Sequence, residues 1–236
     1  MNANPAKLAL LGLIAACIAS PAPALAQTDP FAEKVEALKA SLAASQAALR
    51  QYEWIETTVI SVKGDEKSRE QNRCYYGAEG GVQKVPLTEP EPEKKAHGLR
   101  GRIVERKKEE LSDYMLEAVA MVKSYVPPSE AQVQAAMDAG RVSMDILEPG
   151  KRVRLNIRGY AKPGDTLGVE MDMANNRLLG LSVKTYLEKP DDTVSLEANL
   201  GSLADGTTYT AATTLVAPAK NLKVTVENSG YRKTGS

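Results

Sequence analysis

Cysteine, histidine and aromatic side chains are scarce in this chain. Its 236 residues include two Cys, one His, one Trp and one Phe. A structural zinc site needs about four Cys, His or carboxylate ligands, and proteins that bind single strands of nucleic acid depend on stacked aromatic rings. With 30 basic and 30 acidic residues the formal net charge is zero, so charge gives no attraction to nucleic acid either. The composition therefore predicts no metal site and no nucleic acid partner.

No set of catalytic residues is visible. His97 is the only histidine and lies in a charged, proline-containing segment. A Ser-His-Asp triad needs one histidine, but no Gly-x-Ser-x-Gly turn precedes a helix. The acidic pair Glu170 and Asp172 falls on the polar face of a predicted strand, which is an ordinary place for carboxylates. The glycines fall in chain reversals, so no phosphate-binding loop is present. We expect a protein that is not an enzyme and has no cofactor.

The N-terminal segment predicts export. Lys7 precedes an apolar run over residues 8–18, and Ala24-Leu25-Ala26 supplies the small residues that a signal peptidase recognises. We expect a signal peptide over residues 1–26, cleavage before Gln27 and a periplasmic location. The apolar run is shorter than the ~20 residues that span a bilayer. No other segment is long and apolar enough, so no transmembrane span is expected.

A second interpretation of this segment stays open. Ile14-Ala15-Ala16-Cys17 resembles a bacterial lipobox, and lipidation at Cys17 would make the protein an outer-membrane lipoprotein. If cleavage follows Ala26 instead, Cys74 is the only cysteine left and no internal disulfide can form. We expect Cys74 to be a buried structural thiol.

Apolar residues alternate with polar residues through the second half of the chain. Val153, Leu155 and Ile157 alternate with Arg154 and Asn156, and successive strand side chains point to opposite faces. Such strands form an antiparallel sheet with one covered and one solvated face. Short turns rich in Pro, Gly, Asn and Asp separate them. Strands are predicted at about 54–63, 67–76, 82–87, 142–147, 152–160, 166–173, 177–186, 193–200, 207–215 and 222–228.

Three helices are predicted between these strands. Apolar residues recur at helical spacing from Asp29-Pro30 to about Tyr52 and over residues 99–126. Pro127-Pro128 ends the second helix, and a shorter helix follows to about Ala139. The predicted fold class is α+β: a large curled antiparallel sheet, or half-open β-barrel, covered on its concave face by the N-terminal helix and the inserted helical segment.

The order of these elements resembles the LolA/LppX-like superfamily of periplasmic lipoprotein carriers and lipid-binding proteins. The segment Tyr75-Tyr76-Gly77-Ala78-Glu79-Gly80 is similar to the strand-turn-strand phrases of that family. The resemblance covers nearly all of residues 27–236 and implies one half-barrel domain there. It also implies a hydrophobic ligand, because members of the superfamily hold acyl chains between sheet and helices.

The candidate site is a cavity between the sheet and the helices, lined by apolar residues. A cavity of this kind suits acyl chains, since each buried methylene contributes ~0.8 kcal/mol without precise geometry, and the same residues would equally suit a packed core. The alternative function is a non-enzymatic structural or sensor domain that contacts another envelope protein through a sheet edge or the segment 88–98. The candidate lining residues are Trp54, Leu111, Met115, Met171, Met173, Leu179, Leu181, Val183, Val194 and Leu196.

Overall fold

A computed structural model describes residues 30–87 and 99–234 of the chain. The predicted signal peptide over residues 1–26, the lipobox residue Cys17, and His97 with the segment 88–98 lie outside the described residues. The described elements are α1 (Pro30–Leu49), β1 (Tyr52–Val62), β2 (Asp65–Tyr76), β3 (Val82–Pro86), α2 (Leu99–Lys123), α3 (Glu130–Asp138), β4 (Val142–Glu148), β5 (Arg152–Arg158), β6 (Thr166–Asp172), β7 (Arg177–Tyr186), β8 (Thr193–Ser202), β9 (Thr208–Ala217), the short 3-10 helix η1 (Pro218–Lys220) and β10 (Leu222–Lys233).

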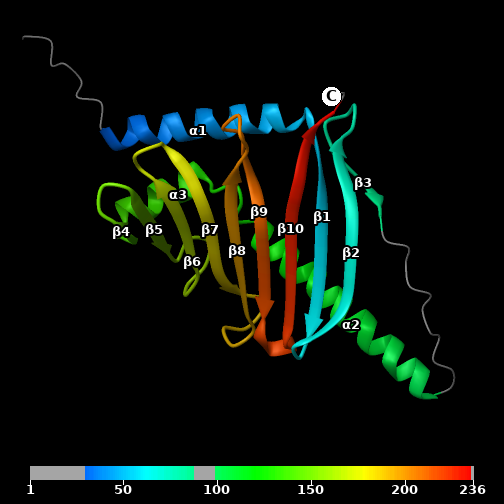
Figure 1. Cartoon of the computed structure of the whole chain (residues 1–236). Helices are drawn as coiled ribbons and strands as arrows, with labels where there is room; N and C mark the ends of the chain where they lie inside the picture. Colours follow the sequence, from blue (N-terminus) through cyan, green and yellow to red (C-terminus); the bar gives the residue numbers. More distant parts are fainter. Residues whose placement is uncertain (1–29, 88–98, 235–236) are drawn as a thin grey trace, which may run out of the picture.

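The ten described strands belong to one antiparallel sheet with the order β3-β2-β1-β10-β9-β8-β7-β6-β5-β4. Strands β4 to β10 are each next to their sequence neighbours, as expected for short turns that leave no room for crossover helices. At the β1–β2 turn, Lys63 and Gly64 both have positive φ (56° and 86°), the type I′ geometry that matches strand twist. The sheet curls without closing, and β3 and β4 are its two free edges (Figure 1).

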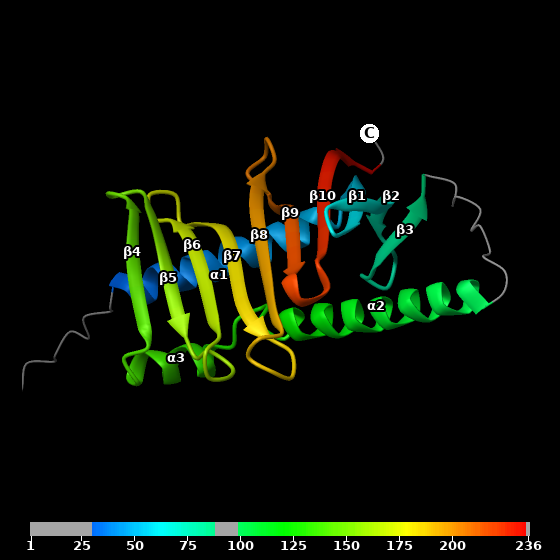
Figure 2. The same ribbon diagram turned by 90° about the horizontal axis from the view of Figure 1, so that it is seen from below.

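The three helices pack on one face of this sheet. Helix α1 runs across the strands at one end of the sheet (Figure 1). Helix α2 lies behind the sheet in Figure 1 and along its concave side in Figure 2. Helix α3 lies near the ends of β4 to β6 (Figure 2). The predicted α+β half-barrel, with its helices on the concave face, is therefore confirmed. Among the described residues no helix has the length and hydropathy needed to cross a bilayer.

Buried apolar side chains gather in two clusters on the concave face. We call the larger the α2 cluster, because Ala118 and Val122 of that helix are in its centre. The smaller, called the α1 cluster, lies at the opposite end of the strands, where Leu38 and Leu42 of α1 pack against the sheet. The α2 cluster consists of Tyr114, Ala118, Val122, Tyr125, Ala136, Ile157, Tyr160, Leu167, Val183, Leu187, Val194, Leu215, Ala217 and Leu222; the α1 cluster consists of Val153, Met171 and Leu178.

Candidate functional site

A row of side chains crosses the concave face between the two clusters. The strand register places its members directly opposite one another on eight consecutive strands, from the free edge β4 to β1. We call it the middle row: Met144, Leu155, Val169, Leu181, Ala198, Thr213, Val226 and Thr58. At about 4.8 Å between strands the row is roughly 34 Å long.

On β5, β6 and β7 the middle row is less buried than the rows on either side, whereas on β8 the three residues Leu196, Ala198 and Leu200 are all half-buried. Its seven members from Leu155 to Thr58 are half-buried, and Met144 is exposed. One row further toward α2, the side chains of Leu167, Val183 and Leu215 are fully or almost fully buried. On β5 to β7 the α1 and α2 clusters thus cover the two ends of the strands and leave the middle positions more accessible.

Small residues contribute to this accessibility. Ala198, Thr213 and Thr58 carry short side chains, so they fill little of the space between the sheet and the helices. Leu111 and Met115 of α2 pack against the α2 cluster and so lie on one side of the row. The N-terminal half of α2 is different, because residues 105–110 are exposed and charged and lie beyond the packed region (Figure 1).

The predicted lining residues divide between several environments. Leu181 lies in the middle row. Val183 and Val194 are buried in the α2 cluster, and Leu196, Leu111 and Met115 pack against it. Met171 is buried in the α1 cluster, against which Met173 packs. Eight of the ten predicted residues therefore lie on the sheet–helix side, but in separate groups. The other two, Trp54 and Leu179, are described next.

A β-bulge decides the position of Leu179. The pairing of β6 and β7 shifts between Glu170 and Met171, so that Gly180 is opposite Glu170 while Leu178 is opposite Met171. Leu178 is consequently the residue that joins the α1 cluster. Leu179 instead lines a shallow depression with charged residues that include Arg152 and Glu170.

Trp54 belongs to a cluster of aromatic rings at one end of β1. Its ring stacks on Tyr231 with 5.5 Å between centroids and 13° between planes, and its Nε1–H donates to Asn228 Oδ1 at 3.0 Å. Tyr76 and Tyr209 extend the cluster. Burial, followed by the negative charge that Tyr209 would carry, raises the pKa of Tyr231. Trp54 shares its face of β1 with Thr58, so these rings lie on the concave side, four residues along β1 from the last member of the middle row.

A buried polar network fixes the chain after α2 to the sheet. Tyr125 Oη donates to Asp165 Oδ2 at 2.6 Å and lies 2.8 Å from Thr185 Oγ1. Asp165 also accepts from the backbone N–H groups of Ala161 and Lys162. Burial and the hydrogen bond to Asp165 raise the pKa of Tyr125. The network holds the C-terminal end of α2 in place, and with it the wall on that side of the middle row.

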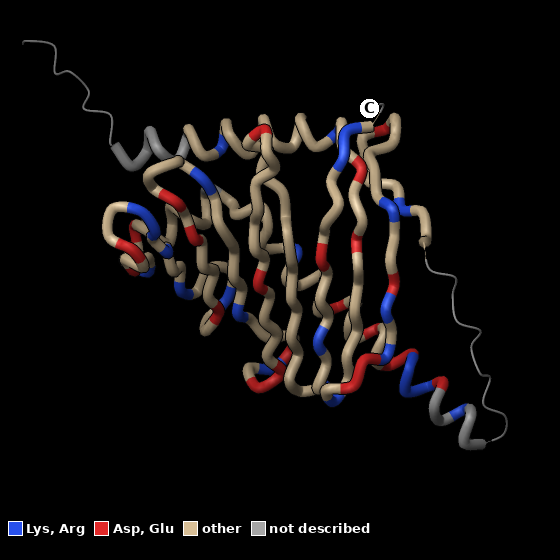
Figure 3. The backbone as a smooth tube through the Cα atoms, viewed as in Figure 1, with Lys and Arg blue, Asp and Glu red and all other residues tan. Residues whose placement is uncertain are grey.

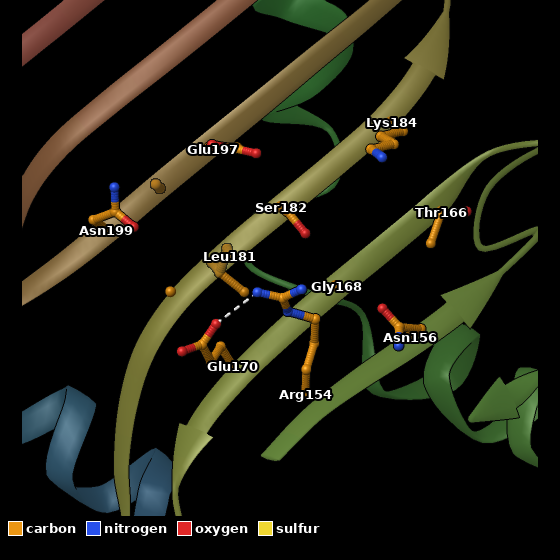
Figure 4. A pocket seen from close by; sticks show the side chains of 12 residues that line it. Arg154, Asn156, Thr166, Gly168, Glu170, Leu181, Ser182, Lys184, Glu197 and Asn199 are labelled. Carbon is orange, nitrogen blue, oxygen red and sulfur yellow. Dashed lines mark hydrogen bonds and ion pairs between the residues drawn. The ribbon is translucent and has the colours of Figure 1, made fainter. Parts of the chain in front are cut away.

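The opposite face of the sheet carries a polar depression of about 310 Å³. Figure 4 shows Arg154, Ser182 and Glu197 among the side chains around it, on strands β5 to β8. Burial disfavours ionised Glu170, but hydrogen bonds from Arg152 and Arg154 outweigh this effect and lower the pKa of the carboxyl group. Because the lining is polar and mixed in charge, this depression does not suit an apolar ligand.

Neither charged residues nor potential metal ligands cluster at one place among the described residues. Basic and acidic residues are mixed along the described chain (Figure 3). Within residues 30–87 and 99–234 there is no group of three His, Cys, Asp or Glu side chains that could hold a metal ion.

Cys74 is buried, as expected, and burial together with the nearby Glu56 raises the pKa of its thiol.

Sequence reasoning missed most of the middle row. Ala198, Thr213 and Thr58 have low hydrophobicity, and only the cross-strand register assembles them with Leu181. The one feature of the sequence that could have predicted this row is the short length of each turn, since the length of a hairpin turn limits which residues of neighbouring strands can pair. A β-bulge shifts the pairing by one residue, so turn length no longer predicts the register beyond it.

Comparisons with known proteins give structural matches alone. No family model matches the chain, and no curated protein matches it. Solved structures that match include a DUF1329 family protein from Desulfovibrio piger, with 10% identity over 89% of this chain and 95% of that chain and a TM-score of 0.37. They also include a LolA superfamily protein from Nitrosomonas europaea, with 8% identity over 84% of this chain and 94% of that chain and a TM-score of 0.37.

Proposed function

We propose that this chain is an exported, non-enzymatic binding protein that holds a hydrophobic ligand, a lipid or lipoprotein acyl chain, along the middle row. The observation that carries the proposal is the half-buried state of this row between two buried clusters. An acyl chain laid along the row would cover side chains from Leu155 to Val226 that the helices leave accessible.

The dimensions and chemistry of the row support this ligand class. The bilayer hydrocarbon core is ~30 Å thick and contains two layers of acyl chains, so one chain is shorter than the row. Val169, Leu181 and Val226 supply apolar contacts, and each methylene moved out of water contributes ~0.8 kcal/mol. Thr58 and Thr213 each add one methyl group to this surface.

The first experiment asks whether a ligand is present at all. The chain is purified from its export compartment, extracted with organic solvent and analysed by mass spectrometry, and the stripped protein is titrated with a fluorescent fatty acid. A co-purified lipid and saturable binding of the probe are expected. A protein that carries no lipid and does not bind the probe would contradict the proposal.

A matched pair of variants then tests the position. Ala198 lies in the middle row, whereas Ala212 lies on the opposite face of the neighbouring strand β9. Ala198→Phe fills the row and should weaken probe binding about tenfold or more, equivalent to about 1.4 kcal/mol. Ala212→Phe should leave binding unchanged. Equal effects of the two substitutions would place the ligand elsewhere.

A further inference from the structure

The two free edges of the sheet are protected to very different degrees. Exposed strand edges invite pairing with other chains, and proteins commonly block them with lysine, proline or short strand length. Strand β3 has five residues and includes Lys84 and Pro86. Strand β4 has seven residues and contains neither lysine nor proline.

The hydrogen-bond pattern shows which residues of each edge face outward. Arg158 N–H donates to Arg141 O at 3.0 Å, so these opposite residues form a hydrogen-bonded pair. Such pairs alternate along an antiparallel ladder. Val142, Met144 and Ile146 therefore direct their N–H and C=O groups away from β5, toward the free edge.

The outward positions of β3 differ from those of β4 in residue type. Leu87 N–H donates to Gln71 O at 2.8 Å, so the outward positions of this edge are 82, 84 and 86. Lys84 and Pro86 occupy two of these three positions, and proline has no N–H to offer. At the β3 edge Pro86 removes one of the three outward N–H groups and Lys84 adds a charge, whereas each outward residue of β4 keeps its N–H and pairs with no other strand among the described residues.

The outward residues of β4 also carry exposed apolar side chains. Met144 is 49% exposed and Ile146 is 68% exposed. They are opposite Leu155 and Val153 of β5, so they lie on the concave face. Met144 is in addition the edge member of the middle row, which therefore reaches the free edge of the sheet.

We propose that β4 pairs antiparallel with β4 of a second copy of this chain, around a two-fold axis at Met144. In this register Met144 is opposite Met144 of the second copy, and Ile146 is opposite its Val142. All three outward positions of each strand then pair with outward positions of the other. The pairing is isologous, as in most homodimers.

The register is also compatible with the charges of β4. It places Ser143 opposite Asp145 of the second copy, where the hydroxyl can donate to the carboxylate. A register centred one residue later would place two Asp145 carboxylates opposite each other, and like charges directly opposite are destabilising. A register centred on Ile146 would place Met144 opposite Glu148.

This dimer would join the middle rows of the two copies. The two-fold axis is perpendicular to the sheet, so both concave faces lie on the same side, and the rows meet at Met144. The pairing itself does not require a ligand, so it can be tested whether or not the proposed function is correct. A single strand pair makes a small interface, and we expect a weak, reversible dimer.

Sedimentation velocity of residues 27–236, from micromolar to near-millimolar concentration, tests the association. The wild-type chain should shift from monomer to dimer. Ile146→Lys copies the protection seen at Lys84 and should weaken dimerisation about tenfold or more. Val82→Lys, at an exposed outward position on the other edge, is the matched control and should dimerise as the wild type does.

A cysteine pair tests the register. Met144→Cys places two thiols across the two-fold axis and should give a disulfide-linked dimer under mild oxidation. Ile146→Cys should not, because its partner is Val142, and Cys74 is buried. A chain that stays monomeric throughout, an Ile146→Lys variant that dimerises normally, or equal cross-linking of the two cysteine variants would overturn the proposal. Thermal unfolding confirms that each variant is folded.

Discussion

Tyr125 donates a 2.6 Å hydrogen bond to the carboxylate of Asp165 inside the core. The two residues are 40 positions apart, one after the end of α2 and the other in the turn before β6. Because both side chains are almost completely buried, no water replaces the bond when it is broken. This contact links the helical side of the middle row to the sheet.

Tyr125→Phe removes the hydroxyl and keeps the ring. A lost hydrogen bond to a buried carboxylate should lower the free energy of unfolding by about 1–2 kcal/mol, measured by urea denaturation. Tyr186→Phe is the control, since its hydroxyl donates to Pro163 O at 3.1 Å in an exposed position and should cost less than about 0.5 kcal/mol. Equal costs for the two variants would show that the network does not hold α2 in place.

Alkaline pH should destabilise the protein through the same tyrosine. Burial, with the hydrogen bond to Asp165, raises the pKa of Tyr125 in the folded state, while the unfolded value is about 10. The unfolded chain therefore loses this proton first, and stability present below pH ~10 falls as pH rises above it. The slope from Tyr125 is at most about 1.4 kcal/mol per pH unit. Urea midpoints between pH 9 and pH 11 should fall less steeply for Tyr125→Phe than for the wild type.

The bulge in β7 predicts unequal effects of two identical substitutions. Leu178 is buried in the α1 cluster, so Leu178→Ala should lower the free energy of unfolding by about 2–4 kcal/mol through lost burial and a cavity. Leu179 lies at the bulge beside a charged depression, so Leu179→Ala should cost less than about 1 kcal/mol. Chemical denaturation compares them directly, and a larger cost at Leu179 would show that Leu179, and not Leu178, is the core residue.

Cys74 should be unreactive in the folded protein. Burial first, and then the charge of Glu56, raises the pKa of its thiol, and the thiolate is the reactive form. In residues 27–236 at neutral pH, a disulfide reagent that releases a coloured thiolate should react slowly. In denaturant it should react fully with one thiol per chain. Rapid labelling under native conditions would show that the β1–β2 end of the sheet opens readily.

The local pattern of residues determined the elements of this protein. Alternation at Val153, Leu155 and Ile157, helical spacing before Pro127, and short polar turns placed the helices and strands close to their observed bounds. The order of short strands without room for crossover helices also predicted a single curled antiparallel sheet. These features depend on neighbours in the chain, so the sequence alone contains them.

The tertiary structure decided which of the apolar residues are buried. Leu181 and Val183 have the same alternation and similar hydrophobicity, yet Val183 is buried under α2 while Leu181 stays half-exposed. The bulge that puts Leu178 in place of Leu179 depends on the pairing of two strands. Burial and register depend on partners distant in the chain, and for this reason the middle row of Ala198, Thr213 and Thr58 becomes visible only when the sheet is assembled.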